Sequence, residues 1–177
     1  MPKRYIITGA PGTGKTSLIQ ALQANGYLCF SEISRKIILE QQQIKSNKTP
    51  WGDLPGFANL VYLQTLEELQ LPLQENSYVD RGLPDIIAYL KAKSHSIPEY
   101  LLDFPFKTHY ASTVFLMPLW EEIYINDPQR PQSFVEAQCI HKHLIEVYQN
   151  FNFTIEVVPK TTLTKRVDLV QSLILQR

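Results

Sequence analysis

Cysteine is scarce in this sequence, which contains only Cys29 and Cys139. Both stand among apolar residues and neither belongs to a C-x-x-C motif, so we expect two reduced packing residues instead of a disulfide or a zinc site. The few histidines also lack the spacing of a metal site, because the two in the same expected helix point to different faces. They are His95, His109, His141 and His143. The composition therefore indicates neither a zinc protein nor a disulfide-rich domain.

An excess of charge of either sign is also missing, since 17 Lys and Arg balance 17 Asp and Glu. Without a global positive field, nucleic acid is a poor candidate partner. No apolar run approaches the ~20 residues that span a bilayer, so we expect no membrane segment. The N-terminal residues Met1 to Arg4 lead directly into a strand-like run and not into a signal peptide, and we expect a cytoplasmic protein.

Repeats, low-complexity tracts and domain linkers are absent as well. The 177 residues, 44% of them apolar, are enough for one core, so residues 1–177 are expected to form a single domain. Short β-rich runs alternate with helical patterns, which is typical of a parallel sheet covered by helices. The five expected strands are Arg4–Thr8, Tyr27–Ser31, Tyr78–Asp80, Ser112–Met117 and Thr154–Val158.

Apolar residues at helical spacing lie between these runs and after the last of them. They include Leu18 and Leu22, Ile33 and Ile37, the group Phe57, Leu60 and Val61, a stripe from Ala137 to Phe151, and the group Val167, Val170 and Ile174. Stretches that contain proline, at residues 46–56 and 119–132, predict loops. The sequence therefore predicts an α/β fold with five strands and helices between them.

What the sequence does contain is a dense glycine motif close to its start. Residues Gly9 to Thr16 match G-x-x-x-x-G-K-[ST] between a strand-like run and a helical pattern, where this motif has its physical meaning. Its glycines let backbone N–H groups converge on phosphate oxygens at a helix N-terminus. We therefore expect a nucleoside triphosphate at Gly9, Ala10, Pro11, Gly12, Thr13, Gly14, Lys15, Thr16 and Ser17.

Two side chains of this motif have separate expected tasks. Lys15 is expected to reach the β- and γ-phosphates, and the Thr16 hydroxyl to bind Mg²⁺. Asp80 ends the third strand-like run. P-loop enzymes have an acidic residue at this place that holds Mg²⁺ through water, so Asp80 is the second candidate for binding the metal.

Arg81 directly follows Asp80 and bears on the type of reaction. ATPases that activate water commonly have Glu at this place, whereas kinases often have an Arg that faces phosphate or substrate, so the pair favours a kinase. Asp85 follows Pro84 at an expected helix start. Proline and an acidic residue are ordinary in the first turn of a helix, so we assign Asp85 a mainly structural role.

Glu32 closes the second strand-like run, and Arg35 follows one helical turn later. Because ligands of parallel sheets lie beyond the carboxyl ends of the strands, Glu32 is a candidate general base or indirect Mg²⁺ ligand. The alternative is a first-turn Glu that pairs with Arg35 on the surface. The sequence leaves both interpretations open.

The segment of residues 119–133 follows the fourth expected strand and contains one basic residue, Arg130. P-loop kinases have a lid at this place, whose Arg closes over the nucleotide, so Arg130 is a candidate catalytic residue. The alternative is an ordinary solvated loop Arg. Tyr124, Gln132 and Ser133 are candidates for the same edge of the site, although aromatic packing explains Tyr124 equally well.

Taken together, these motifs resemble, over nearly the whole chain, the small single-domain P-loop proteins known as AAA-like ATPases. That group is similar to the ribosylnicotinamide kinase domain of bifunctional NAD-biosynthesis regulators. The resemblance implies a three-layer, nucleoside-kinase-like P-loop NTPase fold with strand order 2-3-1-4-5, and ATP with Mg²⁺ as cofactors. It rests on Gly9–Thr16, Glu32 with Arg35, Asp80-Arg81-Gly82 leading to Asp85, Arg130–Phe134, and Val157-Val158-Pro159.

Two functions remain open at this point. The first is a kinase that moves the γ-phosphoryl group of ATP to a hydroxylated metabolite such as a nucleoside, with Lys15, Glu32, Asp80, Arg81 and Arg130 as catalytic residues. The second is an ATPase or a nucleotide-dependent switch without such an acceptor. The DxxG and NKxD patterns of a GTPase do not occur where a G domain has them. The sequence predicts neither the acceptor nor the oligomeric state.

Overall fold

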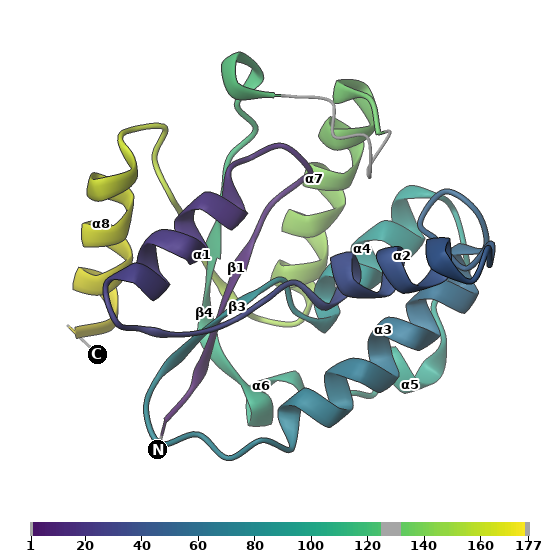
Figure 1. Ribbon diagram of the computed structural model, residues 1–177, viewed down its shortest axis with the longest axis horizontal. Coiled ribbons are helices and arrows are strands. Elements are labelled where there is room, and N and C mark those ends of the chain that lie inside the picture. Colours follow the sequence, from purple (N-terminus) through teal and green to yellow (C-terminus); the bar gives the residue numbers. More distant parts are fainter. Residues whose placement is uncertain (1, 125–131, 176–177) are drawn as a thin grey trace.

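The computed structural model describes residues 2–124 and 132–175, and of residue 175 it describes the backbone alone. Its strands form a five-stranded sheet in the order β2-β3-β1-β4-β5, and all neighbouring strands are parallel (Figure 1). The α/β fold and the strand order are confirmed, and the expected strand ends agree with the observed ones to within two residues. The strands are β1 (Arg4–Thr8), β2 (Leu28–Phe30), β3 (Ser77–Asp80), β4 (Tyr110–Leu116) and β5 (Thr154–Val157).

Helices cover both faces of this sheet. Figure 1 shows α1 (Lys15–Ala24) and α8 (Leu163–Leu175) on one side, and the other long helices on the opposite side. The latter are α2 (Ile33–Gln43), α3 (Leu54–Leu69), α4 (Leu83–Ala92) and α7 (Phe134–Asn150). Short turns of helix, α5 (Glu99–Leu102) and α6 (Phe106–His109), lead into β4, and η1 (Glu121–Ile123) follows it. In the described part of the chain, no helix combines the length and apolar character needed to cross a bilayer.

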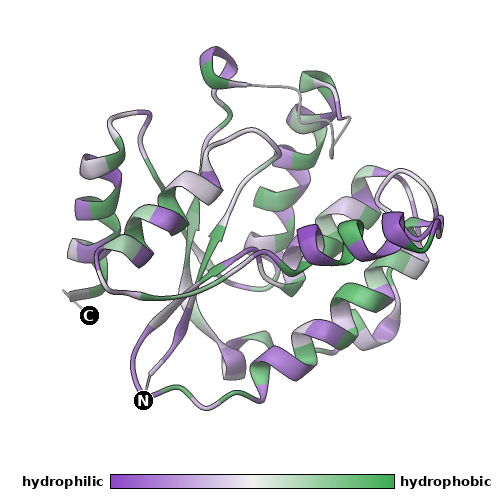
Figure 2. Ribbon diagram, in the orientation of Figure 1, coloured by the Kyte–Doolittle hydropathy of each residue, from purple (hydrophilic) through white to green (hydrophobic). Residues whose placement is uncertain are grey.

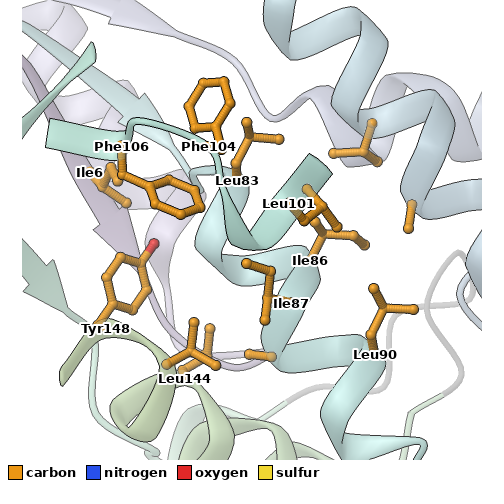
Figure 3. Packing of buried hydrophobic residues seen from close by; sticks show 14 of the residues in the cluster. Ile6, Leu83, Ile86, Ile87, Leu90, Leu101, Phe104, Phe106, Leu144 and Tyr148 are labelled. Carbon is orange, nitrogen blue, oxygen red and sulfur yellow. The ribbon is translucent and has the colours of Figure 1, made fainter. Parts of the chain in front are cut away.

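Each face of the sheet has its own apolar core. The larger core joins α2, α3, α4 and α7 to the sheet, and Figure 3 shows Ile6, Leu83, Ile87 and Leu144 packed together within it. The smaller core lies under α1 and α8 and includes Leu18 and other buried residues. Figure 2 shows polar and apolar residues mixed along the helices, as expected for helices with one buried side. The helical spacing read from the sequence thus identified core-facing positions.

Two local expectations need correction. The expected loop at residues 46–56 ends early, because α3 begins at Leu54. Asp53 is the N-cap, and its Oδ1 accepts a hydrogen bond of 2.9 Å from the N–H of Gly56, which satisfies a donor of the first turn. Cys29 is half-buried against the smaller core, but Cys139 is exposed on α7 and is therefore not a packing residue.

Glu68, near the end of α3, is an acidic group in a partly dehydrated place. Burial raises its pKa to about 7, and nearby Arg4 only partly opposes this effect. The Arg4 guanidinium donates to the backbone oxygens of Glu68 and Leu71 at 3.1 and 2.8 Å. These hydrogen bonds hold Arg4 near Glu68, and Arg4 affects the carboxylate through its charge.

We expect this group to make the protein less stable as the pH rises from about 4.5 to about 7. A carboxyl whose pKa is raised in the folded state stabilises folding while it is protonated, and loses that effect as it ionises in the folded protein. At pH 8, Glu68→Gln should raise the free energy of unfolding by ~1 kcal/mol, less than the ~3 kcal/mol of the full shift, because solvent screens a partly exposed group. Urea unfolding at pH 5 and pH 8 measures this difference.

Glu67→Gln is the control for that experiment, because Glu67 is the exposed neighbour on the same helix. It should leave the pH dependence of unfolding as in the wild type. An equal gain in stability from both variants at pH 8 would contradict the assignment to Glu68.

Candidate active site

The glycine motif forms a tight loop between β1 and α1. Gly9 has φ +152°, and a Cβ there would lie 2.8 Å from the backbone oxygen of Met117. Gly12 has φ +74°, and a Cβ there would lie 2.6 Å from the ring of Tyr124. Both positions need glycine because of the backbone conformation and the close neighbours. The loop therefore has the bare backbone that a phosphate-binding cradle requires.

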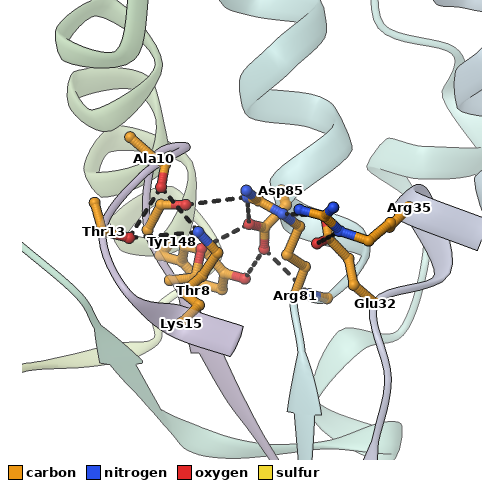
Figure 4. Close-up of polar contacts among 11 residues, drawn as sticks. Thr8, Ala10, Thr13, Lys15, Glu32, Arg35, Arg81, Asp85 and Tyr148 are labelled. Atoms are coloured by element: carbon orange, nitrogen blue, oxygen red, sulfur yellow. Dashed lines mark hydrogen bonds and ion pairs between the residues drawn. The ribbon is translucent and has the colours of Figure 1, made fainter. Parts of the chain in front are cut away.

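The side chains of the motif divide into an inner and an outer set. The Lys15 ammonium group donates to the backbone oxygen of Ala10 at 2.8 Å and lies 3.4 Å from the Thr13 hydroxyl (Figure 4). Thr13 also donates to the Ala10 oxygen, at 2.9 Å. Lys15 is thus a buried cation held across the loop, whereas Thr16 at the start of α1 is exposed.

A surface groove beside the loop brings together three of the residues selected from the sequence. Thr16, Glu32 and Asp80 all line it. They come from the N-terminus of α1, the end of β2 and the end of β3, so the carboxyl edge of the sheet has assembled them. A hydroxyl and carboxylates suit Mg²⁺, which takes few protein ligands and completes its shell with water and phosphate oxygens. Among the residues described, no cluster of three or more His, Cys, Asp and Glu could hold a metal by itself.

Arg81 connects the glycine loop to the opposite side of the site. Its Nε donates to Glu32 Oε1 at 2.8 Å, and its Nη1 donates to the backbone oxygen of Gly9 at 3.1 Å (Figure 4). Arg35 is farther from Glu32, with its Nε 3.9 Å from Oε2. The expected pairing of Glu32 with Arg35 therefore exists, but the closer ion pair is with Arg81.

The Arg81 side chain is only 6% exposed, and its guanidinium stays charged. Burial by itself works to lower its pKa, but Tyr89 and the carboxylates of Glu32, Asp85 and Asp80 raise the pKa well above the usual value. The backbone of Arg81 has φ +72°, a left-handed conformation that costs a bulky residue of order 1–3 kcal/mol. Such strain is characteristic of residues that a site holds in place.

Asp85 accepts hydrogen bonds from Arg81 and from several neighbouring groups. Its carboxylate accepts hydrogen bonds from the Thr8 hydroxyl at 2.6 Å, the Tyr148 hydroxyl at 2.5 Å, Arg81 Nη1 at 3.0 Å and the N–H of Gly82 at 3.1 Å. The last of these contacts belongs to the first turn of α4, as the sequence predicted. The other hydrogen bonds link Asp85 to β1, to α7 and to Arg81. The carboxylate therefore does more than stabilise the first turn of a helix.

A second pocket, lined by Glu32 and Arg81 but by no residue of the glycine loop, lies beside the groove, and we call it the inner pocket. Polar groups line one part of it, including Glu32, Arg81 and Asp85. Aromatic and aliphatic side chains line the rest, among them Phe57, Tyr89, Ile38 and Ile86. Apolar walls with a few converging polar groups are typical of a small-molecule site, but the volume of this pocket, about 20 Å³, is room for about one water molecule.

The expected lid is described only at its two ends. Arg130, its candidate catalytic residue, lies outside the described residues. Tyr124 packs against Gly12, and its hydroxyl donates to the backbone oxygen of Gln132. Gln132 lines the inner pocket. Ser133 does not line that pocket but caps α7, its hydroxyl accepting a hydrogen bond of 3.2 Å from the N–H of Glu136.

The other flank of the glycine loop carries a pair that the sequence did not reveal. The Arg166 guanidinium lies over the Trp120 ring, 4.5 Å from its centroid, and Arg166 Nε donates to the backbone oxygen of Thr161 at 2.9 Å. Arg166 Nη1 lies 3.4 Å from the place of a Cβ at Gly14. This pair therefore borders the loop at Gly14.

Sequence reasoning also missed Thr8, Tyr148 and the ring walls of the inner pocket, Phe57 and Tyr89. Thr8 directly precedes the glycine motif, and its place at the end of a buried strand could have identified it as a residue of the site. Tyr148 is a buried residue of α7 outside the apolar stripe read from the sequence, and nothing local distinguishes it from core. Its contact with Asp85 spans 63 positions of the chain, so only the fold reveals it.

Solved structures of two kinds of kinase share this fold. A deoxyadenosine kinase from M. mycoides, solved with dCMP and a flexible dCDP bound, matches with a TM-score of 0.68 at 16% identity, covering 98% of each chain. The same enzyme with bound dATP matches with a TM-score of 0.62. A thymidylate kinase from Candida albicans matches with a TM-score of 0.68 at 15% identity, covering 99% of this chain and 92% of that one. At these identities the likeness establishes the nucleoside-kinase-like fold alone.

The sequence itself was compared with curated proteins and with protein families. The comparison with curated proteins found no match. The family described as AAA domain matches residues 4–166, which include the glycine loop, Glu32, Arg81, Asp85 and the Trp120–Arg166 pair. The match covers most of the chain and confirms the resemblance to the AAA-like P-loop proteins, whereas the similarity to the ribosylnicotinamide kinase domain stays a prediction. The protein therefore belongs to the AAA domain family of P-loop proteins.

Proposed function

We propose that the protein is a P-loop kinase that transfers the γ-phosphoryl group of ATP to a small hydroxylated acceptor. The observation that carries this proposal is the place of Glu32. Its side chain lines both the groove beside the glycine loop and the separate inner pocket. Hydrolysis needs only the first of these spaces, because its acceptor is water. A transfer reaction needs both, with a polar group between them.

On the triphosphate side, the chain supplies amides, a cation and a hydroxyl. The Gly9–Thr16 backbone and Lys15 bind phosphates, and Thr16 and Asp80 are the residues that would hold Mg²⁺. When bound, Mg²⁺ neutralises charge on the phosphates. Asp80 is 5% exposed, and it reaches the shared groove at the end of β3. These residues fit the cofactor pair expected from the sequence.

On the acceptor side, Glu32 accepts the proton of the acceptor hydroxyl and Arg81 orients the carboxylate. Positioning and electrostatics dominate phosphoryl transfer, so a fixed base beside the phosphates is the main contribution a protein can make. The ion pair at 2.8 Å fixes Glu32 in place. Arg130 completes the set as the lid residue proposed from the sequence.

The lining of the inner pocket suits an uncharged acceptor with a flat ring, such as a nucleoside, and its walls must move apart to admit one because its present volume is about 20 Å³. The rings of Phe57 and Tyr89 offer apolar walls, and Glu32, Asp85 and Arg81 are charged. Among the described lining residues Arg81 is the only cation, and both acids already bind it. A phosphate dianion would therefore meet two carboxylates and a single cation that already pairs with both of them. The fold neighbours include a deoxyadenosine kinase and a thymidylate kinase, and the pocket charge favours the former type.

The direct test is ADP release from Mg²⁺-ATP in a screen of nucleosides, ribosylated vitamins, sugars and nucleoside monophosphates, with product mass determined. We expect slow turnover without an acceptor, faster turnover with one or more nucleosides, and little response to monophosphates. Rapid hydrolysis that no acceptor accelerates would reject the kinase and favour the ATPase or switch. Preference for a monophosphate would retain the kinase but reject the nucleoside acceptor.

A further inference from the structure

We propose that Asp85 and Tyr148 are positioning residues that set the orientation of the Arg81 guanidinium between the glycine loop and the inner pocket. This inference rests on the proposed function, since it assigns a task to residues beside the proposed base. Neither residue needs to touch a substrate. They act through Arg81, which contacts both Glu32 and the backbone of Gly9.

The contacts form one connected path. Tyr148 donates to Asp85 Oδ2, while Thr8 and Arg81 donate to Asp85 Oδ1. Arg81 then donates to Glu32. Figure 4 shows these side chains converging from α7, β1, α4 and the ends of β2 and β3. The path thus runs from the far helix α7 to the residue that lies between the two binding spaces.

Burial makes the carboxylate of Asp85 sensitive to its donors. Thr8 is 0% exposed, Tyr148 1% and Asp85 3%, so water cannot replace a lost hydrogen bond. Burial and the charge of Asp85 raise the pKa of Tyr148 well above its usual value, so its hydroxyl stays protonated and remains a donor. Each oxygen of Asp85 accepts two hydrogen bonds, which fixes the carboxylate in one rotation.

Arg81 depends on this fixed carboxylate. Its left-handed backbone, with φ +72°, is a conformation that the surrounding contacts must maintain. Nη1 is shared between Asp85 and the Gly9 oxygen, and Nη2 is buried without a hydrogen-bond partner among the described residues. If Asp85 rotates, Nη1 loses its charged partner and the guanidinium is free to turn away from Gly9. The Nε contact to Glu32 would shift with it.

Three variants test this proposal. Tyr148→Phe removes one donor to Asp85 and keeps the ring in the core. Thr8→Val removes the other hydroxyl donor with little change in volume. Tyr78→Phe is the matched control, because Tyr78 is equally buried but belongs to the smaller core on the other face of the sheet. Thermal unfolding of all variants measures the general cost of losing a buried hydroxyl.

The first readout is the NMR signal of the Arg81 Nε–H group, which requires no activity. We expect its chemical shift and its protection from solvent exchange to change in Tyr148→Phe and Thr8→Val, and to remain as in the wild type in Tyr78→Phe. An unchanged Arg81 signal in Tyr148→Phe and Thr8→Val would overturn the proposal. This readout decides the positioning role even if the screen reveals no acceptor and the proposed function fails.

The second readout is steady-state transfer to an acceptor identified by the screen. Tyr148→Phe should lower kcat about tenfold, because a displaced base costs the transition state more than it costs binding, with the dissociation constant of ATP unchanged. Tyr78→Phe should leave both constants unchanged. A loss of melting temperature in Tyr148→Phe with kcat at the wild-type value would assign Tyr148 to stability alone and overturn the proposal.

Discussion

Glu32→Gln should suppress phosphoryl transfer about 10²- to 10⁴-fold, the range that a general base commonly contributes, while ATP still binds. Gln is similar in size to Glu, and its amide oxygen can accept the hydrogen bond that Arg81 Nε now donates at 2.8 Å. It cannot take the proton of an acceptor hydroxyl. Single-turnover transfer to the acceptor, together with calorimetry of ATP binding, separates the two effects.

The thermal stability of Glu32→Gln must be measured together with its activity. Glu32 is 7% exposed, and removing its charge leaves the buried Arg81 with fewer anionic partners. Assays should therefore be run well below the melting temperature of the variant. Glu40→Gln is the matched control, because Glu40 is exposed on α2, the helix whose N-cap is Glu32, and lies 3.9 Å from Lys36. Transfer at the wild-type rate in Glu32→Gln would exclude Glu32 as the base.

Lys15→Ala should weaken ATP binding about ten- to a hundredfold, the equivalent of roughly 1.5 to 3 kcal/mol for the loss of a charged hydrogen-bond donor. The loop itself should survive this change. Thr13 still donates to the Ala10 oxygen at 2.9 Å, so that carbonyl group keeps a partner when the ammonium group is removed. Calorimetric titration with ATP and Mg²⁺ measures the change in affinity.

Lys142→Ala provides the control for charge alone. Its side chain on α7 is 77% exposed and far from the loop in sequence, so ATP affinity should equal that of the wild type. Unchanged affinity in Lys15→Ala would contradict the assignment of residues 9–16 as the triphosphate site.

The sequence was most informative where a short stretch of the chain forms a complete structural motif. The glycine loop needs only the end of one strand, a turn and the start of one helix, and these lie within about fifteen consecutive residues. Strand and helix patterns likewise depend on local periodicity, which is why the α/β architecture was predicted from alternating runs. Strand order came from a family resemblance, because local patterns do not specify which strands become neighbours.

The carboxyl ends of the strands were a second useful guide, because they indicated where the candidate site residues lie. Glu32, Asp80 and Arg81 were selected because each follows a strand, and all three lie at the same edge of the sheet. The rule holds because parallel strands all point the same way, so their ends converge. What the rule does not give is the pairing among these side chains. Local reasoning pairs Glu32 with Arg35, but the closer partner of Glu32 is Arg81, 49 positions away.

The sequence by itself therefore determined the fold class and the phosphate-binding loop, because both arise from contacts between residues close in the chain. Only the tertiary structure decided that Asp85 joins Thr8, Tyr148 and Arg81, and that Phe57 and Tyr89 enclose an inner pocket beside them. A buried hydroxyl or ring in a helix looks like core in any local pattern. Its partner is set by how α4 and α7 pack on the sheet, and that packing depends on the shapes of many side chains at once.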